Sequence, residues 1–187
     1  MYWILFVMAA IAAVIVAVIV GGLVTPRDHA VARTVRVPAA PGDVWHTVRN
    51  VGAYGDWRHE IEHAEVIDAD QPQVRWRETS TRGSVSFGVT REDAPHTMSA
   101  RILDDDLPFT GEWTWHVEAD GTGTRVAITE RGSVSNPVFR FIGAHFIGYT
   151  KSIDAYLSAL AAHHGAPRAA IADAPVRDAA GACLTAR

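Results

Sequence analysis

The chain has 187 residues, of which 17 are Lys or Arg and 21 are Asp or Glu, so its formal net charge at pH 7 is −4. This negative charge and the absence of a Lys/Arg run argue against nucleic acid as a partner. The single cysteine, Cys183, cannot form a disulfide within the chain, which agrees with a reducing compartment. The sequence contains no phosphate-binding glycine loop or nucleophile elbow, and it predicts no cofactor.

The chain opens with an uncharged apolar run, Tyr2–Val24, that is long enough to cross a membrane. At about 1.5 Å per residue, a helix of this length covers the ~30 Å hydrocarbon layer with some tilt. A cleaved signal peptide is the main alternative, but it typically has basic residues before a shorter apolar stretch, and none precede this run. A buried helix of a soluble protein is the other alternative. We therefore expect a transmembrane anchor at residues 1–25.

Three arginines, Arg27, Arg33 and Arg36, follow the apolar run, whereas only the α-amine precedes it. Because Lys and Arg favour the cytoplasmic side of a membrane, this bias predicts a single-pass protein whose globular part lies in the cytoplasm. The globular part, residues 26–165, has the size of one domain.

Short segments of strand character make up most of the globular part. His29–Ala39 alternates in hydropathy and predicts a strand, and a short helix is expected to begin at Pro41. Turn signals such as Asp-Gln-Pro and Asp-Gly-Thr-Gly separate the later segments, and such short connections favour antiparallel hairpins. The six further strands are expected at about Ala64–Ala69, Val74–Thr81, Val85–Arg91, Thr97–Leu103, Phe109–Ala119 and Thr124–Val134.

The last predicted element is one long amphipathic helix. Asn136 is a good N-cap and Pro137 a good first helical residue, and the helix is expected to end near Gly165. Apolar residues recur beyond Pro137 at steps of three and four, which gives one stripe that can cover a sheet. The remaining residues, 166–187, are small, Ala-rich and interrupted by proline, and they predict a disordered tail.

This order of elements resembles the START-like superfamily (SRPBCC), in particular its polyketide cyclase/dehydrase and lipid-transport branch. The resemblance is carried by VPAAPGDVWHTVRNVGAYGDW, VRWRETST, FTGEWTWHVEADGTGTRVAITERGSV and NPVFRFIGAHFIGYTKSIDAYLSAL, and it spans about His29 to Gly165. It implies an α+β helix-grip fold, in which a curved antiparallel sheet surrounds a long C-terminal helix with a hydrophobic cavity between them. It also implies an apolar ligand such as a lipid or polyketide, although the family shares no catalytic residues that carry over.

Side chains alternate between the two faces of a strand, so parity assigns each residue to a face. The apolar positions of their strands place Glu78 and Glu130 on the inner face, whereas Glu112, Thr114 and His116 fall on the solvent face. The same reasoning, with the stripe of the last helix, gives the predicted ligand contacts: Trp76, Glu78, Phe87, Trp113, Trp115, Glu130, His145 and Tyr149.

Each of these residues also has a structural interpretation. An inward carboxylate is either an anchor or acid/base group for a ligand, or a strand-end residue that is wetted or paired with Arg82 or Arg131. His145 is either a ligand contact or a core histidine that bonds a backbone carbonyl or one of the glutamates. The inward tryptophans can equally be core packing, because core and cavity wall are nearly the same surface in this fold.

The sequence HEIEH, His59–His63, matches the H-E-x-x-H pattern of zinc proteases. That site needs a continuous helix, so that both histidines meet one zinc ion. Here a short turn precedes the pattern and a β-like stretch follows it. We therefore expect a polar junction between two elements and no metal site.

Three functions remain open from the sequence. The first is a membrane-tethered domain that binds a hydrophobic small molecule or lipid, with phenylalanines near the start of the last helix forming a mouth. The second is a cyclase-, dehydrase- or hydrolase-type enzyme in which Glu78, Glu130 and His145 converge on one substrate atom. The third is a structural or interaction domain whose interior is filled.

Overall fold

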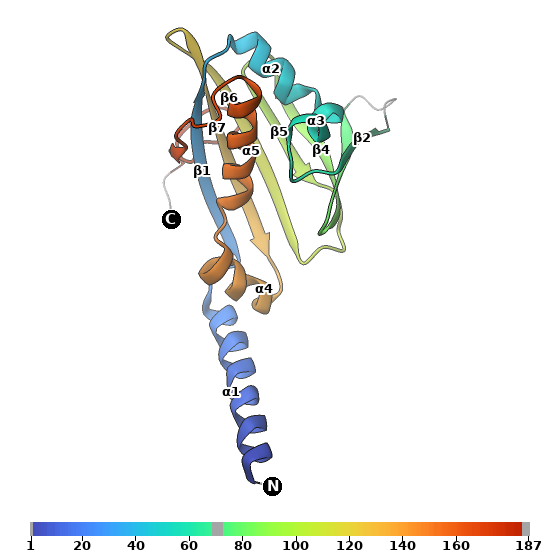
Figure 1. The fold of residues 1–187 in the computed structure, drawn as a ribbon, viewed down its shortest axis with the longest axis vertical. Helices are drawn as coiled ribbons and strands as arrows, with labels where there is room; N and C mark the ends of the chain where they lie inside the picture. Colours follow the sequence, from blue (N-terminus) through green and yellow to red (C-terminus); the bar gives the residue numbers. More distant parts are fainter. Residues whose placement is uncertain (1, 69–72, 185–187) are drawn as a thin grey trace.

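The computed structural model describes residues 2–68 and 73–184, and it shows one long helix that projects from an α+β body (Figure 1). The N-terminal elements are α1 (Tyr2–Val24), β1 (Asp28–Val37), α2 (Pro41–Arg49), the 3₁₀ turn η1 (Val51–Ala53) and α3 (Tyr54–Trp57). The strands that follow are β2 (His63–Ile67), β3 (Arg75–Ser80), β4 (Gly83–Asp93), β5 (Thr97–Ile102), β6 (Phe109–Asp120) and β7 (Gly123–Val134). The C-terminal elements are α4 (Pro137–Ile142), the π-helical turn η2 (Gly143–Ile147), α5 (Lys151–His163) and β8 (Ala172–Asp173).

All strands lie in one sheet with the order β2-β3-β4-β5-β6-β7-β1-β8, and every described pair is antiparallel. Strands β2 to β7 follow one another as a meander, as the short turn signals predict. The tight β6–β7 turn uses Gly121, whose φ of 62° favours glycine because a side chain would be strained there. β1, which precedes the meander in the chain, pairs with its last strand, β7, and the short β8 pairs with the other side of β1.

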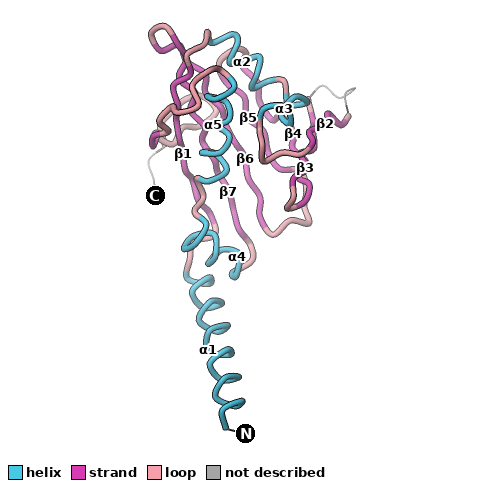
Figure 2. Tube along the Cα trace, in the orientation of Figure 1, coloured by secondary structure: helices cyan, strands magenta, loops and turns pink. Residues whose placement is uncertain are grey.

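The core lies between the inner face of the sheet and the helices. α5 buries Ile153, Tyr156, Leu157 and Leu160 against the sheet, and α2 buries Val44, Trp45 and Val48. Figure 2 shows α5 running along the strands, with α2 near its upper end and α3 to one side of it. This is the helix-grip arrangement that the sequence predicts, so the α+β fold class is confirmed.

The C-terminal helix differs from the prediction because it is interrupted. It begins as expected, since the side chain of Asn136 accepts hydrogen bonds from the backbone N–H groups of Val138 and Phe139 at 2.9 and 3.3 Å. The helix then becomes a π-turn and stops at Gly148, which has a φ of 78°. Glycine disfavours helix and tolerates this left-handed conformation, so the chain changes direction before α5. One continuous helix from 136 to 165 is therefore wrong.

The C-terminal segment also differs from the disordered tail that the sequence predicts. β8 pairs with β1, and the backbone N–H of Arg177 donates to Thr129 Oγ1 at 3.3 Å on the outer face of the sheet. This packing explains why Thr114 and His116, predicted to face solvent, are buried. Burial lowers the pKa of His116, and the nearby Arg177 lowers it further.

Candidate ligand-binding site on the inner face

A polar cluster lies on the inner face of β6, β7 and β1. The register places Trp113 of β6 opposite Glu130 of β7, and Glu130 opposite Val31 of β1. The indole N–H of Trp113 donates to Glu130 Oε2 at 2.8 Å. The other carboxylate oxygen lies 3.3 Å from Nε2 of His29, two residues before Val31 and therefore on the same face. Three strands thus bring one carboxylate, one imidazole and one indole together.

Tyr149, in the linker between η2 and α5, completes this cluster. Its ring stacks on His29 with centroids 3.8 Å apart and an interplanar angle of 12°. Gly132 lies opposite His29 in the register, and a Cβ there would stand 2.5 Å from His29 Cε1. Glycine at 132 is therefore what allows the imidazole to lie across β7 and reach Glu130. We call these four residues, His29, Trp113, Glu130 and Tyr149, the inner cluster.

The inner cluster is partly shielded from water and has an unused hydrogen-bonding group. The side chains of His29 and Glu130 are only 13% and 16% exposed, so their interaction is partly shielded from water. His29 Nδ1 is buried and has no hydrogen-bond partner within the described residues. Buried polar atoms usually have partners, so this nitrogen is an unused hydrogen-bonding group of the inner cluster. The carboxylate also keeps lone pairs free for a further donor.

The second inward carboxylate, Glu78, has different surroundings. Its Oε1 accepts hydrogen bonds at 2.9 Å from both Arg58 Nη1 and Trp76 Nε1. Arg58 also donates to Glu60 at 2.9 Å. Burial alone would lower the pKa of Arg58, but the two carboxylates outweigh it and raise that pKa. Glu78 is therefore a neutralised structural charge, paired with an arginine as one interpretation predicts, although the arginine is neither Arg82 nor Arg131.

The two carboxylates do not share a site. Three strands lie between β3, which carries Glu78, and β7, which carries Glu130. At about 4.8 Å per strand, this separates them by roughly 19 Å along the sheet. Among residues 2–68 and 73–184, none forms a hydrogen bond to both carboxylates. The convergence of Glu78, Glu130 and His145 on one substrate atom, which the enzyme hypothesis requires, is not what the structure shows.

His145 lies on the exposed side of η2. Its Nδ1 is 3.0 Å from the backbone oxygen of Phe141, and its ring stacks on the Phe141 ring at 4.6 Å. His145 is exposed because the helix breaks at Gly148. As a result, η2 does not continue the face of α5 that packs on the sheet. One predicted alternative, a bond to a backbone carbonyl, is observed, but outside the core.

The predicted aromatic wall divides into core and accessible residues. Trp76 and Trp115 are 1% and 3% exposed, so they belong to the packed core. Trp113 and Phe87 are only partly buried, so they present apolar surface to a ligand. Tyr156 of α5 contacts Trp113 and Trp115 with ring centroids 5.8 and 5.9 Å apart. Trp113 belongs to the inner cluster, whereas Phe87 lies on β4, with β5 between it and β6, and stacks on Trp76.

Sequence reasoning missed two residues of importance. His29 begins a predicted strand, and the signal that reveals it is its parity with Val31, Val35 and Val37, which places it on the inner face. Arg58 follows a segment expected to be a turn, and no local pattern connects it to Glu78. The HEIEH segment, His59–His63, forms a turn and the first residue of β2, so its histidines do not share a helical face.

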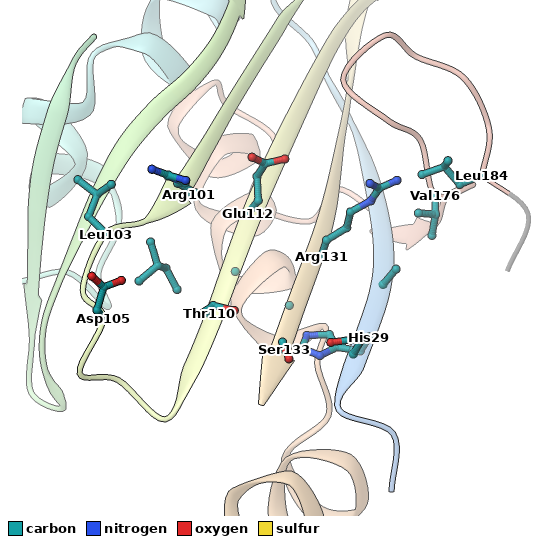
Figure 3. A pocket seen from close by; sticks show the side chains of 15 residues that line it. His29, Arg101, Leu103, Asp105, Thr110, Glu112, Arg131, Ser133, Val176 and Leu184 are labelled. Carbon is teal, nitrogen blue, oxygen red and sulfur yellow. The ribbon is translucent and has the colours of Figure 1, made fainter. Parts of the chain in front are cut away.

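An open groove lies on the opposite, outer face of the sheet (Figure 3). Its volume is about 1010 Å³, and its lining includes Arg101, Glu112, Arg131, Val176 and Leu184. Val176 and Leu184 come from the C-terminal segment, whereas the charged residues project outward from β5, β6 and β7. The lining mixes charged residues with apolar ones such as Leu103, Val176 and Leu184, and unlike the inner face it contains no tryptophan, tyrosine or phenylalanine. It also includes His29, so the groove reaches one residue of the inner cluster.

Several solved structures share this fold. The aromatase/cyclase Zhui from Streptomyces sp. R1128 has a TM-score of 0.63 at 17% identity, covering 73% of this chain and 93% of Zhui. Norcoclaurine synthase from Thalictrum flavum has a TM-score of 0.59 at 15% identity, covering 77% and 90%. The di-domain ARO/CYC protein BexL from the BE-7585A biosynthetic pathway has a TM-score of 0.62 at 12% identity. That match covers 75% of this chain but 51%, about half, of BexL. These identities show a common fold alone.

No curated protein matches the sequence at a significant level. A family model described as "Polyketide cyclase / dehydrase and lipid transport" matches residues 28–165. The matched region runs from the start of β1 to the end of α5 and so contains the whole meander, the inner cluster and the Arg58–Glu78 pair. Because this match covers most of its length, the chain belongs to the polyketide cyclase / dehydrase and lipid transport family.

Proposed function

We propose that this protein is a membrane-anchored domain that binds a hydrophobic small molecule or lipid against the inner face of its sheet. The inner cluster is the observation that carries the proposal, because it sets one polar group beside half-buried aromatic surface. Binding sites for small apolar ligands combine these two features: apolar walls and a few well-placed polar groups. The family, which includes lipid transport, supports an apolar ligand.

Each part of the inner cluster has a role in this proposal. Trp113 supplies apolar contact area beside the carboxylate, and Phe87 on β4 extends the apolar face of the sheet. Glu130 accepts a hydrogen bond from a hydroxyl or amine on the ligand, and His29 orients the carboxylate through its Nε2. Tyr149 holds the His29 ring in place by stacking. A ligand with one polar end and an apolar body matches this order of groups.

The proposed anchor is α1, whose best 18-residue window has a mean hydropathy of 3.1 and is 0% buried. β1 begins four residues after α1 ends, so His29 stands close to the base of the anchor. The inner cluster is thus at the end of the body nearest α1, where a membrane-borne ligand would arrive. Tethering raises the effective concentration of such a ligand at the site.

Native mass spectrometry of the full chain in nanodiscs of synthetic lipid tests the proposal. We expect the protein purified from cells to retain an apolar molecule other than the nanodisc lipid. Trp113→Ala should retain less of it because an apolar wall is lost. Arg75→Ala, an exposed residue of β3, should retain as much as the wild type, provided that melting temperatures show all three proteins folded. A wild-type protein that never carries such a molecule would contradict the proposal.

An enzyme remains the second candidate, favoured by the His29–Glu130 pair. A carboxylate beside an imidazole can hold the ring in one tautomer while its other nitrogen gives or takes a proton. This would suit the cyclase or dehydrase chemistry after which the family is named. If the retained molecule is a substrate, wild type should convert it and His29→Asn should return it unchanged. Recovery of the same molecule from both proteins would oppose this candidate.

A further inference from the structure

The segment formed by α4 and η2, Pro137–Ile147, exposes an apolar face. Outside α1, eight large apolar side chains of the described residues are exposed, and five of them lie in this segment. They are Val138 (36% exposed), Phe139 (55%), Ile142 (36%), Phe146 (72%) and Ile147 (51%). A concentrated apolar patch on an otherwise polar body marks an interaction site and not ordinary surface variation.

The only permanently charged residue of this segment faces away from the patch. Arg140 is 3% exposed and donates hydrogen bonds to the backbone oxygens of Thr25 at 3.1 Å and Ser135 at 3.0 Å. Thr25 directly follows α1, so the guanidinium satisfies a carbonyl at the C-terminal end of that helix, where a positive charge is favourable. The outward side of the segment is therefore free of permanent charge.

The segment packs on the last turn of α1. A Cβ at Gly22 would stand 1.9 Å from the backbone oxygen of Pro137, and one at Gly21 would stand 2.7 Å from the ring of Phe141. These two glycines let α4 touch the helix, as Figure 1 shows at the base of the body. At about 1.5 Å per residue, they lie only about 3 to 5 Å inside the end of the apolar run at Val24. Because α4 contacts these two glycines, it lies at the same depth as the last turn of α1.

We propose that α4 and η2 lie in the lipid–water interface of the membrane that α1 crosses, with their exposed apolar side chains inserted among the lipids. This rests on the proposed anchoring by α1. A span of 23 residues is about 34 Å long, a little more than the ~30 Å hydrocarbon layer, so its last turn reaches the boundary. Amphipathic helices bury an apolar face about 5–10 Å into that boundary. Anchored in this way, the body holds the inner cluster next to the membrane.

Depth measurements on the full chain in nanodiscs of phosphatidylcholine and phosphatidylglycerol test this proposal. Cys183 is the only cysteine, so a Cys183→Ser background accepts single nitroxide labels at chosen positions. We would label Phe146→Cys in η2, Val14→Cys within α1, and His46→Cys on α2 at the opposite end of the body. Relative accessibility to oxygen and to a water-soluble nickel chelate reports the depth of each label.

The expected order is a deep Val14 label, a shallow but lipid-exposed Phe146 label and an aqueous His46 label. A Val14 label in lipid with an aqueous Phe146 label would overturn the interfacial position and leave the anchor intact. An aqueous Val14 label would overturn both. Dipolar coupling between Phe146 labels of two chains, with low oxygen accessibility, would assign the patch to a second copy and so overturn the lipid as its occupant.

Discussion

Glu78 and Glu130 are chemically alike but lie in opposite kinds of surroundings. Both project from the inner face, and each accepts a hydrogen bond from a tryptophan indole, at 2.9 and 2.8 Å. Glu78 then meets Arg58, whose guanidinium also lies over the rings of Tyr54 and Tyr156 at 5.1 and 5.0 Å. Glu130 meets His29 instead, an imidazole that carries no permanent charge. The partner decides whether an inward carboxylate is a fixed structural charge or a chemically available one.

Removal of Arg58 should have the largest effect on stability. Arg58→Ala leaves Glu78 buried without its cation, and breaking such a pair costs about 3–5 kcal/mol. The exposed Arg75 pairs with Asp68 at 3.4 Å, and Arg75→Ala should cost about 0–1 kcal/mol. Thermal unfolding of the full chain in detergent compares the two variants. Equal losses of stability in the two variants would contradict a structural role for the Arg58–Glu78 pair.

Neutralising each carboxylate in turn separates the two environments directly. Glu78→Gln leaves Arg58 without a buried counter-charge and should lower the free energy of unfolding by about 2–3 kcal/mol. Glu130→Gln keeps an acceptor for the indole of Trp113 and should cost about 1 kcal/mol. Denaturant unfolding measures both values. A larger loss of unfolding free energy in Glu130→Gln than in Glu78→Gln would contradict the assignment of Glu78 as the structural charge.

Gly132 tests how the His29–Glu130 pair is built. Gly132→Ala places a Cβ against the His29 ring and should cost about 1–3 kcal/mol while moving His29 away from Glu130. Its cross-strand partner provides a matched control, because a Cβ at Gly111 would stand 3.6 Å from Ile102 Cδ1, an ordinary contact. Melting temperatures and ligand retention of both alanine variants check this. Equal behaviour would show that the close approach of His29 to β7 has no consequence.

The smallest expected effect is on the pH dependence of stability, through the phenol groups of Tyr54 and Tyr156 beside Arg58. Burial raises the pKa of Tyr54 and of Tyr156 above the ordinary value of about 10. Above pH 10 the unfolded chain releases these protons while the folded chain retains them. Their contribution is therefore complete below pH 10 and is lost as the pH rises further. Tyr156→Phe should show a shallower fall between pH 9 and 11, and an unchanged slope would contradict this account.

Much of the architecture is readable from the sequence, because alternation, turn residues and caps are local signals. The meander, the cap at Asn136, the inward direction of Glu130 and the order of elements all depend on such signals. The site was only partly predictable, because partners come from distant parts of the chain. His29 and Glu130 are 101 residues apart, and Arg58 meets Glu78 across a turn with no recognisable pattern.

The interruption of the last helix was not predictable for a related reason. Gly143 and Gly148 weaken a helix, yet the apolar stripe continues through them and suggests one element. The break falls at Gly148, and the part before it packs on α1, a contact between distant parts of the chain that no local pattern reveals. The position of the C-terminal segment was not predictable either. Its small residues have no strong secondary-structure propensity, and its place is set by contacts with β1 and with the polar outer face of β7.

Ligand retention by two glutamate variants tests the central claim most directly. Glu130→Gln changes the inner cluster, and Glu112→Gln makes the same change on the outer face of β6, where Glu112 accepts a hydrogen bond from Thr90 at 3.2 Å. Native mass spectrometry of both full-length variants in nanodiscs should show retention reduced about tenfold in Glu130→Gln, equivalent to about 1.4 kcal/mol, and unchanged in Glu112→Gln. Equal retention by the two variants would contradict a binding site at Glu130.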